Sequence, residues 1–526
     1  MSRFRTATVT TLLLVPIVAG GFLLQEPPVR ANARLFDQVR SLITSQYVDS
    51  IKDSQVFEKA AHGLVRELND PYSELLTPKE SESFNRSTNG RYGGTGMLLE
   101  EQSGIGVVVG RVFPNTPAAE AGVLEGDRII GIDTASTQGW PINKVSENLR
   151  GKPGSQVTVT YARPGVTEPI KLRFTRAIVH IPAVQYSGLL GGNIGYVPLQ
   201  TFNENAAEEV EAAVRRLEQQ GAKGIVLDMR ENGGGIVEQA LAVSGLFLRE
   251  GQEIVSVRSR TGPNEMARAR GLHLDTNIPL VVLVDGSSAS ATEIVAGALQ
   301  DHDRALIVGT RTFGKGLVQS VFPLDGGYYL KMTTGKWFTP SGRSIHRERQ
   351  LLADGRFVET QPDSIESDSA RKARPAFKSD AGRVVYGGGG ITPDVRVLDD
   401  TLATVDQEFL RAIAPKGQLV QTVLQRYAFE LKGTVKPGFA VDPAWSGELL
   451  RRLDAAGVAV EPRFRLSATR VLVEELERRV ARMALGDAAA KERELGSDQP
   501  LSAAVALLRK STTQRELFAV AVRSAR

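Results

Sequence analysis

A serine and a lysine in two short, glycine-containing runs are the residues of this chain best suited to chemistry. Ser290 lies in the run at residues 286–293, and Lys315 lies between two glycines in the run at 312–319. A serine hydroxyl becomes a nucleophile when a neighbouring base takes its proton. A lysine serves as that base if burial among apolar neighbours lowers its pKa by about two to three units from about 10.4. The two runs therefore predict a serine nucleophile with a lysine base.

The elements on either side of Ser290 place it at a turn between a strand and a helix. The apolar residues 278–284 predict a buried strand, and residues 293–299 predict a helix. A helix N-terminus has unpaired backbone N–H groups, so it stabilises the oxyanion that forms when a hydroxyl attacks a carbonyl. Serines at this place also cap helices, which is their commoner role, and this segment alone leaves that alternative open.

A glycine turn follows a second predicted strand. Residues 223–230 have the pattern of a strand, and residues 236–248 have that of a helix. Between them stand Gly233, Gly234 and Gly235. Glycines let a backbone N–H approach a ligand closely, which suits a second oxyanion donor as well as a tight turn.

Other chemistries are disfavoured. Residues 309–316 imitate the phosphate-binding loop GxxxxGK[ST], but Gly316 replaces the hydroxyl that would bind magnesium, and β-like residues follow where that loop needs a helix. The chain has no cysteine, and its five histidines form no HExxH pair or metal-ligand cluster, so we expect no metal and no cofactor. His302 directly follows the predicted nucleophile helix, which indicates a solvated helix end rather than the base of a Ser-His-Asp triad.

The three segments together resemble the C-terminal processing peptidases, tail-specific serine proteases built on a Ser-Lys-Gln arrangement. The nucleophile motif of this family, Ser-Ala-Ser-Ala-Ser-Glu, stands here with Thr292 in place of its last serine, and the lysine motif Thr-Phe-Gly-Lys-Gly-x-Val-Gln is intact. The resemblance covers roughly residues 35–396. It implies that Ser290 is the nucleophile, Lys315 the base and Gln319 the residue that orients the lysine.

The same resemblance implies that two backbone N–H groups bind the oxyanion. One belongs to Ala291 and the other to a glycine of the turn, for which we expect Gly234. Relatives often have proline at the position of Gly233. For residues 178–399 the resemblance implies a crotonase-like α/β peptidase core.

Residues 87–177 resemble a bacterial PDZ domain. A Gly-Gly-Thr-Gly-Met-Leu run opens this module, residues 116–130 carry its second motif, and the alternation in residues 156–161 predicts a short strand. Such domains add the end of a peptide as a strand and bind its terminal carboxylate in a loop of backbone N–H groups. We expect that loop to comprise Thr95, Gly96, Met97 and Leu98.

The N-terminal residues 1–33 have the pattern of an export signal. Two arginines precede an apolar run at residues 7–24, and Ala-Asn-Ala follows at 31–33. The run is long for a signal peptide and barely long enough to span a bilayer, so cleavage after Ala33 and retention as a single membrane anchor both stay open. In either case we expect the catalytic part outside the cytoplasm, in the periplasm or cell envelope.

Helices are expected at both ends of the folded chain. Residues 34–86 have helical patterns, and in the family this region supplies entry helices and sometimes a dimer contact. Residues 400–526 lie beyond the resemblance and predict a helical region. An amphipathic helix at 467–485 is predicted from one apolar stripe, formed by Val471, Leu472, Leu476 and Val480. Such a stripe is most often core, and an interface for a dimer or a substrate-delivering partner is the alternative.

Length and composition agree with an α/β multidomain protein. The 526 residues suffice for three or four domains, and 41% hydrophobic with 24% charged residues is an ordinary globular composition. The net charge of +4 is small, and basic residues are interleaved with acids, so we expect no nucleic-acid partner. The polar residues 351–383 predict a long loop or flap within the peptidase core. The expected fold is thus a serine-lysine protease core with an inserted PDZ domain, N-terminal helices and a C-terminal helical appendage.

The sequence therefore predicts an exported serine endopeptidase that captures proteins by an apolar C-terminal tail and cleaves them through an acyl-enzyme on Ser290. Its expected partners are such protein substrates and the membrane, through the N-terminal segment. A homodimer and an adaptor protein are also open. The alternative is a catalytically silent PDZ-containing scaffold or chaperone, which would have lost the nucleophile or the base, whereas Ser290 and Lys315 are both present.

Overall fold

The computed structural model describes residues 28–102, 106–163, 165–271, 274, 278–351, 357–359, 372–398 and 403–524. The chain divides into two compact units, of which the first comprises Met1–Pro78 with Gln319–Thr333 and the second Lys79–Val318 with Thr334–Arg526. Most of the expected export signal lies outside the described residues. Among the described residues, no helix is both long and apolar enough to cross a membrane.

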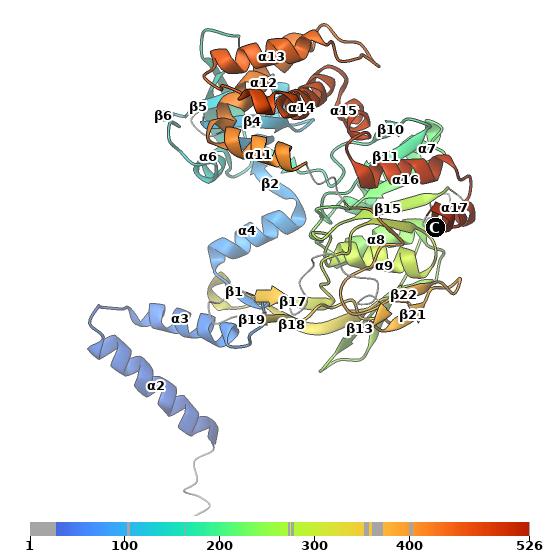
Figure 1. Ribbon diagram of the computed structural model, residues 1–526. Helices are drawn as coiled ribbons and strands as arrows, with labels where there is room; N and C mark the ends of the chain where they lie inside the picture. Colours follow the sequence, from blue (N-terminus) through green and yellow to red (C-terminus); the bar gives the residue numbers. More distant parts are fainter. Residues whose placement is uncertain are drawn as a thin grey trace, which may run out of the picture. The chain divides into compact units, whose positions relative to one another are not determined.

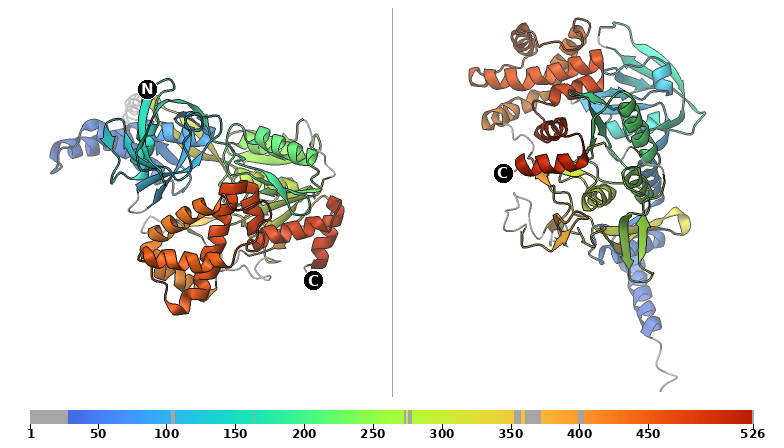
Figure 2. Two further views of the ribbon diagram at one scale, coloured as in Figure 1. Left: turned by 90° about the horizontal axis from the view of Figure 1, so that it is seen from above. Right: turned by 90° about the vertical axis from the view of Figure 1, so that its right-hand side faces the viewer.

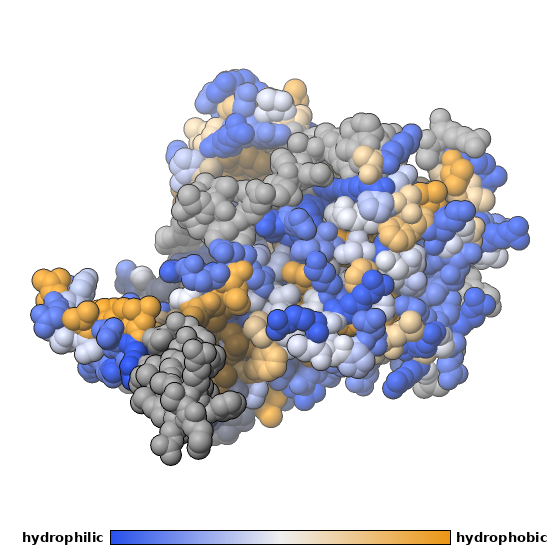
Figure 3. All heavy atoms as spheres, turned by 90° about the horizontal axis from the view of Figure 1, so that it is seen from below, coloured by the Kyte–Doolittle hydropathy of each residue, from blue (hydrophilic) through white to orange (hydrophobic). Residues whose placement is uncertain are grey.

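The first unit begins with two helices, as the sequence predicts. Helix α2 (Pro28–Gln46) and helix α3 (Asp53–Arg66) are joined by an ion pair between Arg40 and Asp53 (2.5 Å). Apolar side chains remain exposed on both helices, where Figure 3 shows orange patches at its left side. They include Leu35, Phe36, Val39, Leu42, Ile43, Phe57 and Leu64.

A short strand completes the first unit. Strand β1 (Glu74–Leu76) pairs antiparallel with the beginning of β18 (Tyr329–Phe338), which also pairs with β17 (Leu317–Pro323). The β conformation after Lys315 agrees with the argument against a phosphate-binding loop, because that loop would lead into a helix.

The module predicted at residues 87–177 folds around its own core. Helix α4 (Pro78–Asn89) leads to it, and β2 (Arg91–Gly94) pairs with β9 (Ala177–His180) where the chain enters and leaves. Its sheet has the order β3-β4-β5-β7-β8. The bounds are β3 (Met97–Gln102), β4 (Gly106–Val112), β5 (Arg128–Ile132), β6 (Ala135–Ser136), β7 (Gln156–Ala162), β8 (Ile170–Thr175), α5 (Pro117–Glu120) and α6 (Ile142–Leu149). Burial alternates along β7, which confirms the predicted strand.

A six-stranded sheet forms the centre of the second unit (Figure 1). Its order is β10-β11-β12-β15-β16-β23, and all neighbours are parallel except β10 and β11. The bounds are β10 (Gly188–Leu190), β11 (Ile194–Pro198), β12 (Gly224–Asp228), β15 (Leu280–Val284), β16 (Leu306–Gly309) and β23 (Val395–Arg396). Every residue of β12 and β15 is buried. Parallel strands covered on both faces carry continuous apolar runs, as the sequence of β15 does.

Helices cover both faces of this sheet. One face carries α7 (Ala206–Gln219), α8 (Val237–Phe247) and α9 (Ala291–Asp301). The other carries α16 (Gln499–Arg509) and α17 (Gln514–Ser524), the dark red helices of Figures 1 and 2. Their apolar side chains share one core cluster with β12 and β15. The end of the chain therefore contributes to the core of the central sheet.

The preceding C-terminal helices have a core of their own. It lies among α11 (Thr404–Ile413), α12 (Gly417–Leu431), α13 (Ala444–Ala455) and α14 (Arg465–Leu485), and α15 (Asp487–Glu494) then leads to α16. Helix α14 confirms the predicted amphipathic helix. Leu472, Leu476 and Val480 are buried in this core and Val471 packs against it, so the stripe is core.

A second, smaller sheet and two hairpins complete the described chain. Strand β13 (Glu253–Ser259) pairs with β14 (Glu265–Arg268) and with the end of β18. The hairpins are β19 (Arg349–Leu351) with β20 (Phe357–Glu359), and β21 (Ala376–Lys378) with β22 (Val384–Tyr386). The segment 351–383, expected as a loop, thus contains short strands in its described parts.

Candidate active site

Ser290 stands at a sharp turn between β15 and α9, as the sequence predicts. Its backbone has φ 57° and ψ −115°, a conformation rare for a residue with a side chain. Such a conformation costs about 1–3 kcal/mol and persists only where surrounding contacts hold it. Its side chain is half-buried, whereas every residue of α9 behind it is buried. The hydroxyl is therefore presented on a rigid, strained turn at a helix N-terminus.

Glu293 holds this turn together with the lysine loop. The carboxylate is fully buried, and its Oε2 accepts hydrogen bonds from the backbone N–H groups of Ser290 (2.9 Å) and Lys315 (2.8 Å). Its Oε1 accepts from the Gly314 N–H (2.7 Å) and the Thr312 hydroxyl (2.5 Å). Because one oxygen binds both amides, the backbone nitrogens of Ser290 and Lys315 lie within about 6 Å of each other.

The environment of Glu293 opposes its ionisation. Burial raises the pKa of this carboxyl, against the lowering effect of the hydrogen bonds that it accepts. Sequence reasoning missed this residue as part of the site. The signal was present, since a serine followed three positions later by glutamate at a helix start is the capping-box pattern.

The two glycines beside Lys315 are required by close packing. Gly314 has φ +86°, and a Cβ there would lie 2.8 Å from the Arg347 Cβ. A Cβ on Gly316 would lie 2.8 Å from the backbone nitrogen of His346. Lys315 itself is half-buried, and its carbonyl accepts from the Trp337 indole N–H (3.0 Å). The glycine pattern that imitates a phosphate loop therefore has a packing explanation.

The glycine turn contacts the nucleophile turn directly. The Asn232 carbonyl accepts from the Ala289 N–H (3.0 Å) and from the Thr292 hydroxyl (2.8 Å). Thr292, the one departure from the nucleophile motif of the family, thus uses its hydroxyl to join the two turns. Gly234 has φ +100°, and a Cβ there would lie 3.0 Å from both the Ser290 Cβ and the Ala291 nitrogen.

The expected oxyanion donors lie next to Ser290. Ala291 is the first residue of α9, and its N–H points from a helix N-terminus. The Gly234 N–H donates to the Asn232 side-chain oxygen (2.9 Å) in this structure. An oxyanion at Gly234 therefore requires that this hydrogen bond opens, and the choice of Gly234 stays a prediction.

Gln319 lies on β17 in the first unit. Its side-chain amide donates to the Thr333 hydroxyl (3.3 Å) in that unit. Its predicted action on Lys315, which belongs to the second unit, stays a prediction from the sequence.

The expected carboxylate loop of the β-rich module is held by backbone contacts. The carbonyls of Thr95 and Gly96 accept from the N–H groups of Ala118 (2.8 Å) and Phe113 (3.0 Å). Gly96 has φ +92°, and a Cβ there would clash with Thr116. In the same loop, Thr95 and Met97 are buried, whereas Leu98 is 44% exposed at the start of β3. The assignment of these residues to a carboxylate site stays a prediction.

His302 makes its contacts at the C-terminal end of α9, opposite to the end that carries Ser290. It caps the C-terminus of α9, and its ring nitrogens lie 2.8 Å from the Asp380 carboxylate and 2.7 Å from the Glu253 carbonyl. Its side chain is 9% exposed, so the expectation of a solvated helix end is wrong in that respect. Within the described part of the chain, no three His, Asp or Glu side chains are grouped as a metal site would need.

Comparisons with known proteins give three family matches. The peptidase family S41 model matches residues 193–355, the PDZ domain model residues 108–163, and the model of the activating protease CtpB N-terminal domain residues 26–79. All three fall on regions that the sequence motifs single out.

Two curated relatives match over most of their length. The carboxy-terminal-processing protease of Bartonella bacilliformis is 39% identical over 317 residues, which cover 59% of this chain and 71% of the relative. The carboxy-terminal processing protease CtpA of Bacillus subtilis is 33% identical over 346 residues, which cover 65% and 73%. Among solved structures, a photosystem II D1 C-terminal processing protease is 30% identical, with 68% of this chain and 85% of that chain covered at a TM-score of 0.37.

Proposed function

Because this chain belongs to the carboxy-terminal processing proteases of peptidase family S41, we propose that it cleaves proteins through an acyl-enzyme formed on Ser290. The neutral amine of Lys315 takes the proton of the Ser290 hydroxyl as the oxygen attacks the peptide carbonyl. The negative charge that forms on the carbonyl oxygen is stabilised by the N–H groups of Ala291 and Gly234. Gln319 orients the lysine.

The second half of the reaction reuses the same base. Lys315, now protonated, gives its proton to the leaving amine, and the acyl group stays on Ser290 as an ester. The lysine, neutral again, then takes a proton from a water molecule that attacks the ester. As the new C-terminus is released, Lys315 gives that proton to the Ser290 oxygen, which restores the hydroxyl and the neutral amine.

The shared hydrogen bonds of Glu293 are the observation that best supports this assignment. One buried carboxylate oxygen binds the amides of both Ser290 and Lys315, although the two residues belong to different loops. A fold that needed Ser290 only as a helix cap would not require the lysine loop at the same oxygen. The shared oxygen keeps the two loops adjacent, which supports a serine nucleophile with a lysine base.

The β-rich module is the proposed receptor for substrate tails. A PDZ domain binds an extended C-terminus as an added strand, and we assign the terminal carboxylate to the loop of Thr95, Gly96, Met97 and Leu98. Apolar tails are the proposed preference, and tail binding favours the arrangement of the site in which the base and the oxyanion donors are aligned.

The proposed location is the periplasm or cell envelope. The arginines and apolar run of residues 1–33 support export, by a cleaved signal or an anchor. The exposed apolar side chains on α2 and α3 support a homodimer as a further partner.

A cleavage experiment with matched tails tests the proposal. The purified chain is incubated with an unfolded protein that ends in apolar residues, and with the same protein ending in charged residues. We expect cleavage of the first substrate, slower cleavage of the second, and none by Ser290→Ala or Lys315→Ala. Cleavage by Ser290→Ala at the parent rate would refute the nucleophile, and equal cleavage of both tails would refute the tail recognition.

A further inference from the structure

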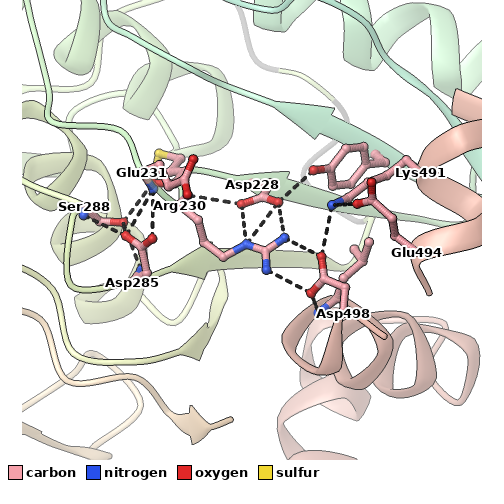
Figure 4. A network of polar contacts seen from close by, with 11 residues as sticks. Asp228, Arg230, Glu231, Asp285, Ser288, Lys491, Glu494 and Asp498 are labelled. Carbon is pink, nitrogen blue, oxygen red and sulfur yellow. Dashed lines mark hydrogen bonds and ion pairs between the residues drawn. The ribbon is translucent and has the colours of Figure 1, made fainter. Parts of the chain in front are cut away.

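A largely buried network of charges joins the strand before the glycine turn to the C-terminal helices (Figure 4). Arg230 follows β12 by two residues, and its guanidinium binds two carboxylates at once. Its Nη2 lies 2.7 Å from Asp228 Oδ2, and its Nη1 and Nη2 lie 2.9 and 2.8 Å from the two oxygens of Asp498. The Arg230 and Asp498 side chains are only 15% and 12% exposed. Bidentate pairs of this kind fix geometry as well as contributing energy.

Asp498 is itself held from three sides. It is the N-cap of α16, and its Oδ1 accepts from the Leu501 N–H (3.0 Å). Its Oδ2 accepts from the Lys491 ammonium (3.0 Å), which also binds Glu494 (2.7 Å). Burial alone would raise the pKa of Asp498, but Arg230 and Lys491 lower it to about 2. The carboxylate is therefore charged at any pH near neutrality.

The chain beyond Arg230 passes this constraint to the site. The next residue, Glu231, has φ 59°, and its N–H donates to both oxygens of Asp285 (3.1 and 3.0 Å). Asp285 Oδ1 also accepts from the Ser288 hydroxyl (3.0 Å), two positions before the nucleophile. After Glu231 comes Asn232, whose carbonyl binds the nucleophile turn. The chain that enters the glycine turn is thus held at two successive residues, by the side chain of Arg230 and by the backbone N–H of Glu231.

We propose that Arg230 and Asp498 are positioning residues for the reaction, so that helices α15 and α16 complete the active site from the C-terminal region. Asp498 orients Arg230, and Arg230 fixes the path of the chain into the glycine turn beside Ser290. The inference rests on the proposed roles of Ser290 and of this turn. It assigns a catalytic purpose to a region that lies beyond the sequence motifs of the peptidase core.

Packing alone does not require this ion pair. Helix α16 already buries Leu501, Ala504, Val505, Leu507 and Leu508 against the sheet or its neighbours. A buried ion pair is weak evidence for stability, because desolvation of the charges offsets their attraction. Asparagine or serine would cap α16 as well as aspartate does. The bidentate geometry therefore orients Arg230 in addition to any part that Asp498 has in holding the N-terminus of α16.

The test replaces Asp498 by asparagine in the full chain. Asp498→Asn keeps the shape and the N-cap but turns an N–H₂ group toward Arg230 and Lys491, so the bidentate pair is lost. We expect kcat on a short chromogenic peptide to fall about 10- to 100-fold with an unchanged KM, because small displacements of a catalytic group have effects of this size. The rate constant of Ser290 labelling by a fluorophosphonate should fall in parallel. Glu448→Gln is the matched control, because Glu448 also forms ion pairs with arginines, Arg451 and Arg452 on helix α13. The Glu448→Gln variant should have the parental kcat.

Each outcome decides between positioning and attachment. A merely structural role predicts fewer active molecules but an unchanged labelling rate constant per active molecule, and that result would overturn the proposal, as would a parental kcat. If Asp498→Asn does not fold, Asp498→Ser, which retains the cap, is measured in the same way. Ser290→Ala separates the two hypotheses. If Ser290→Ala still cleaves, the proposed nucleophile is wrong. If Ser290→Ala is inactive and Asp498→Asn has the parental kcat, only the positioning role is wrong.

Discussion

Replacing Glu293 by glutamine should lower the activity of the site while leaving the fold in place. The Glu293 carboxylate accepts all four of its hydrogen bonds, from three backbone N–H groups and from the Thr312 hydroxyl. A glutamine offers one oxygen and one N–H₂ group. With the N–H₂ group at the Oε1 position, the Thr312 hydroxyl can turn to accept from it, and only the Gly314 N–H faces a donor. With the N–H₂ group at the Oε2 position, the amides of Ser290 and Lys315 both lose their acceptor.

The magnitude follows from the lost hydrogen bonds. A buried N–H left without a partner costs about 1–3 kcal/mol, so in the more favourable orientation the unpaired Gly314 N–H displaces the lysine loop at a cost of about 1–3 kcal/mol. If the same free energy is needed to restore the catalytic geometry, kcat falls about 5- to 160-fold. Global stability should change less, because the buried charge is removed at the same time. Burial raises the pKa of Glu293, which means that its ionised form is disfavoured in the folded chain.

The assay combines kcat on a chromogenic peptide, the rate constant of Ser290 labelling and thermal unfolding. Asp394→Asn is a matched control, because Asp394 is also a buried carboxylate of raised pKa that accepts from a backbone N–H, that of Ile307 (2.8 Å). It should lose stability and keep its labelling rate constant. The reasoning is refuted if Glu293→Gln retains the parental kcat, or if both variants lose labelling equally.

The pH profile gives an independent check of Glu293. A group whose pKa is raised on folding contributes stability below its unfolded pKa, and that contribution is lost as pH rises through the folded value. Activity has the opposite dependence, because protonation removes an acceptor from the hydrogen bonds that hold Ser290 and Lys315. We expect kcat of the parent to fall on the acid side as Glu293 protonates, and this limb to be absent from the small residual activity of Glu293→Gln.

Three further outcomes are expected. Gly234→Ala should lower kcat about 100-fold or more with the fold retained, since φ +100° is strained for alanine and the new methyl would lie 3.0 Å from the Ser290 Cβ; kinetics and circular dichroism check this. Thr292→Val should lower the free energy of unfolding by about 0.5–1.5 kcal/mol in urea titrations, because the Asn232 carbonyl loses one of its two donors, whereas Thr292→Ser should be near the parent. Folding lowers the pKa of Asp498 from 3.8 to about 2, so this carboxylate should contribute about 2 kcal/mol to the free energy of unfolding. The contribution should be constant between about pH 5 and 8 and should be lost as the pH falls through about 2. Urea titrations of the parent and of Asp498→Asn at several pH values measure it.

The sequence by itself determined the elements and the chemical groups of the site. The apolar run of residues 278–284 and the helix after Ser290 are local patterns, and a strand at Leu280–Val284 and helix α9 form there. The identities of Ser290 and Lys315 within two specific motifs, together with the motif of the β-rich module, were sufficient to indicate the family. Local patterns suffice here because hydrophobic periodicity and turn residues act over a few positions.

Only the tertiary structure decided how these groups are held. Glu293 reads as an ordinary helix cap in the sequence, and its second role appears only when the lysine loop reaches the same carboxylate. Likewise, nothing near Arg230 in the sequence indicates Asp498, which lies far along the chain and meets it only because α16 packs on the central sheet. Contacts of this kind depend on how elements distant in the sequence pack together, so they cannot be predicted from the residues that neighbour a side chain in the sequence.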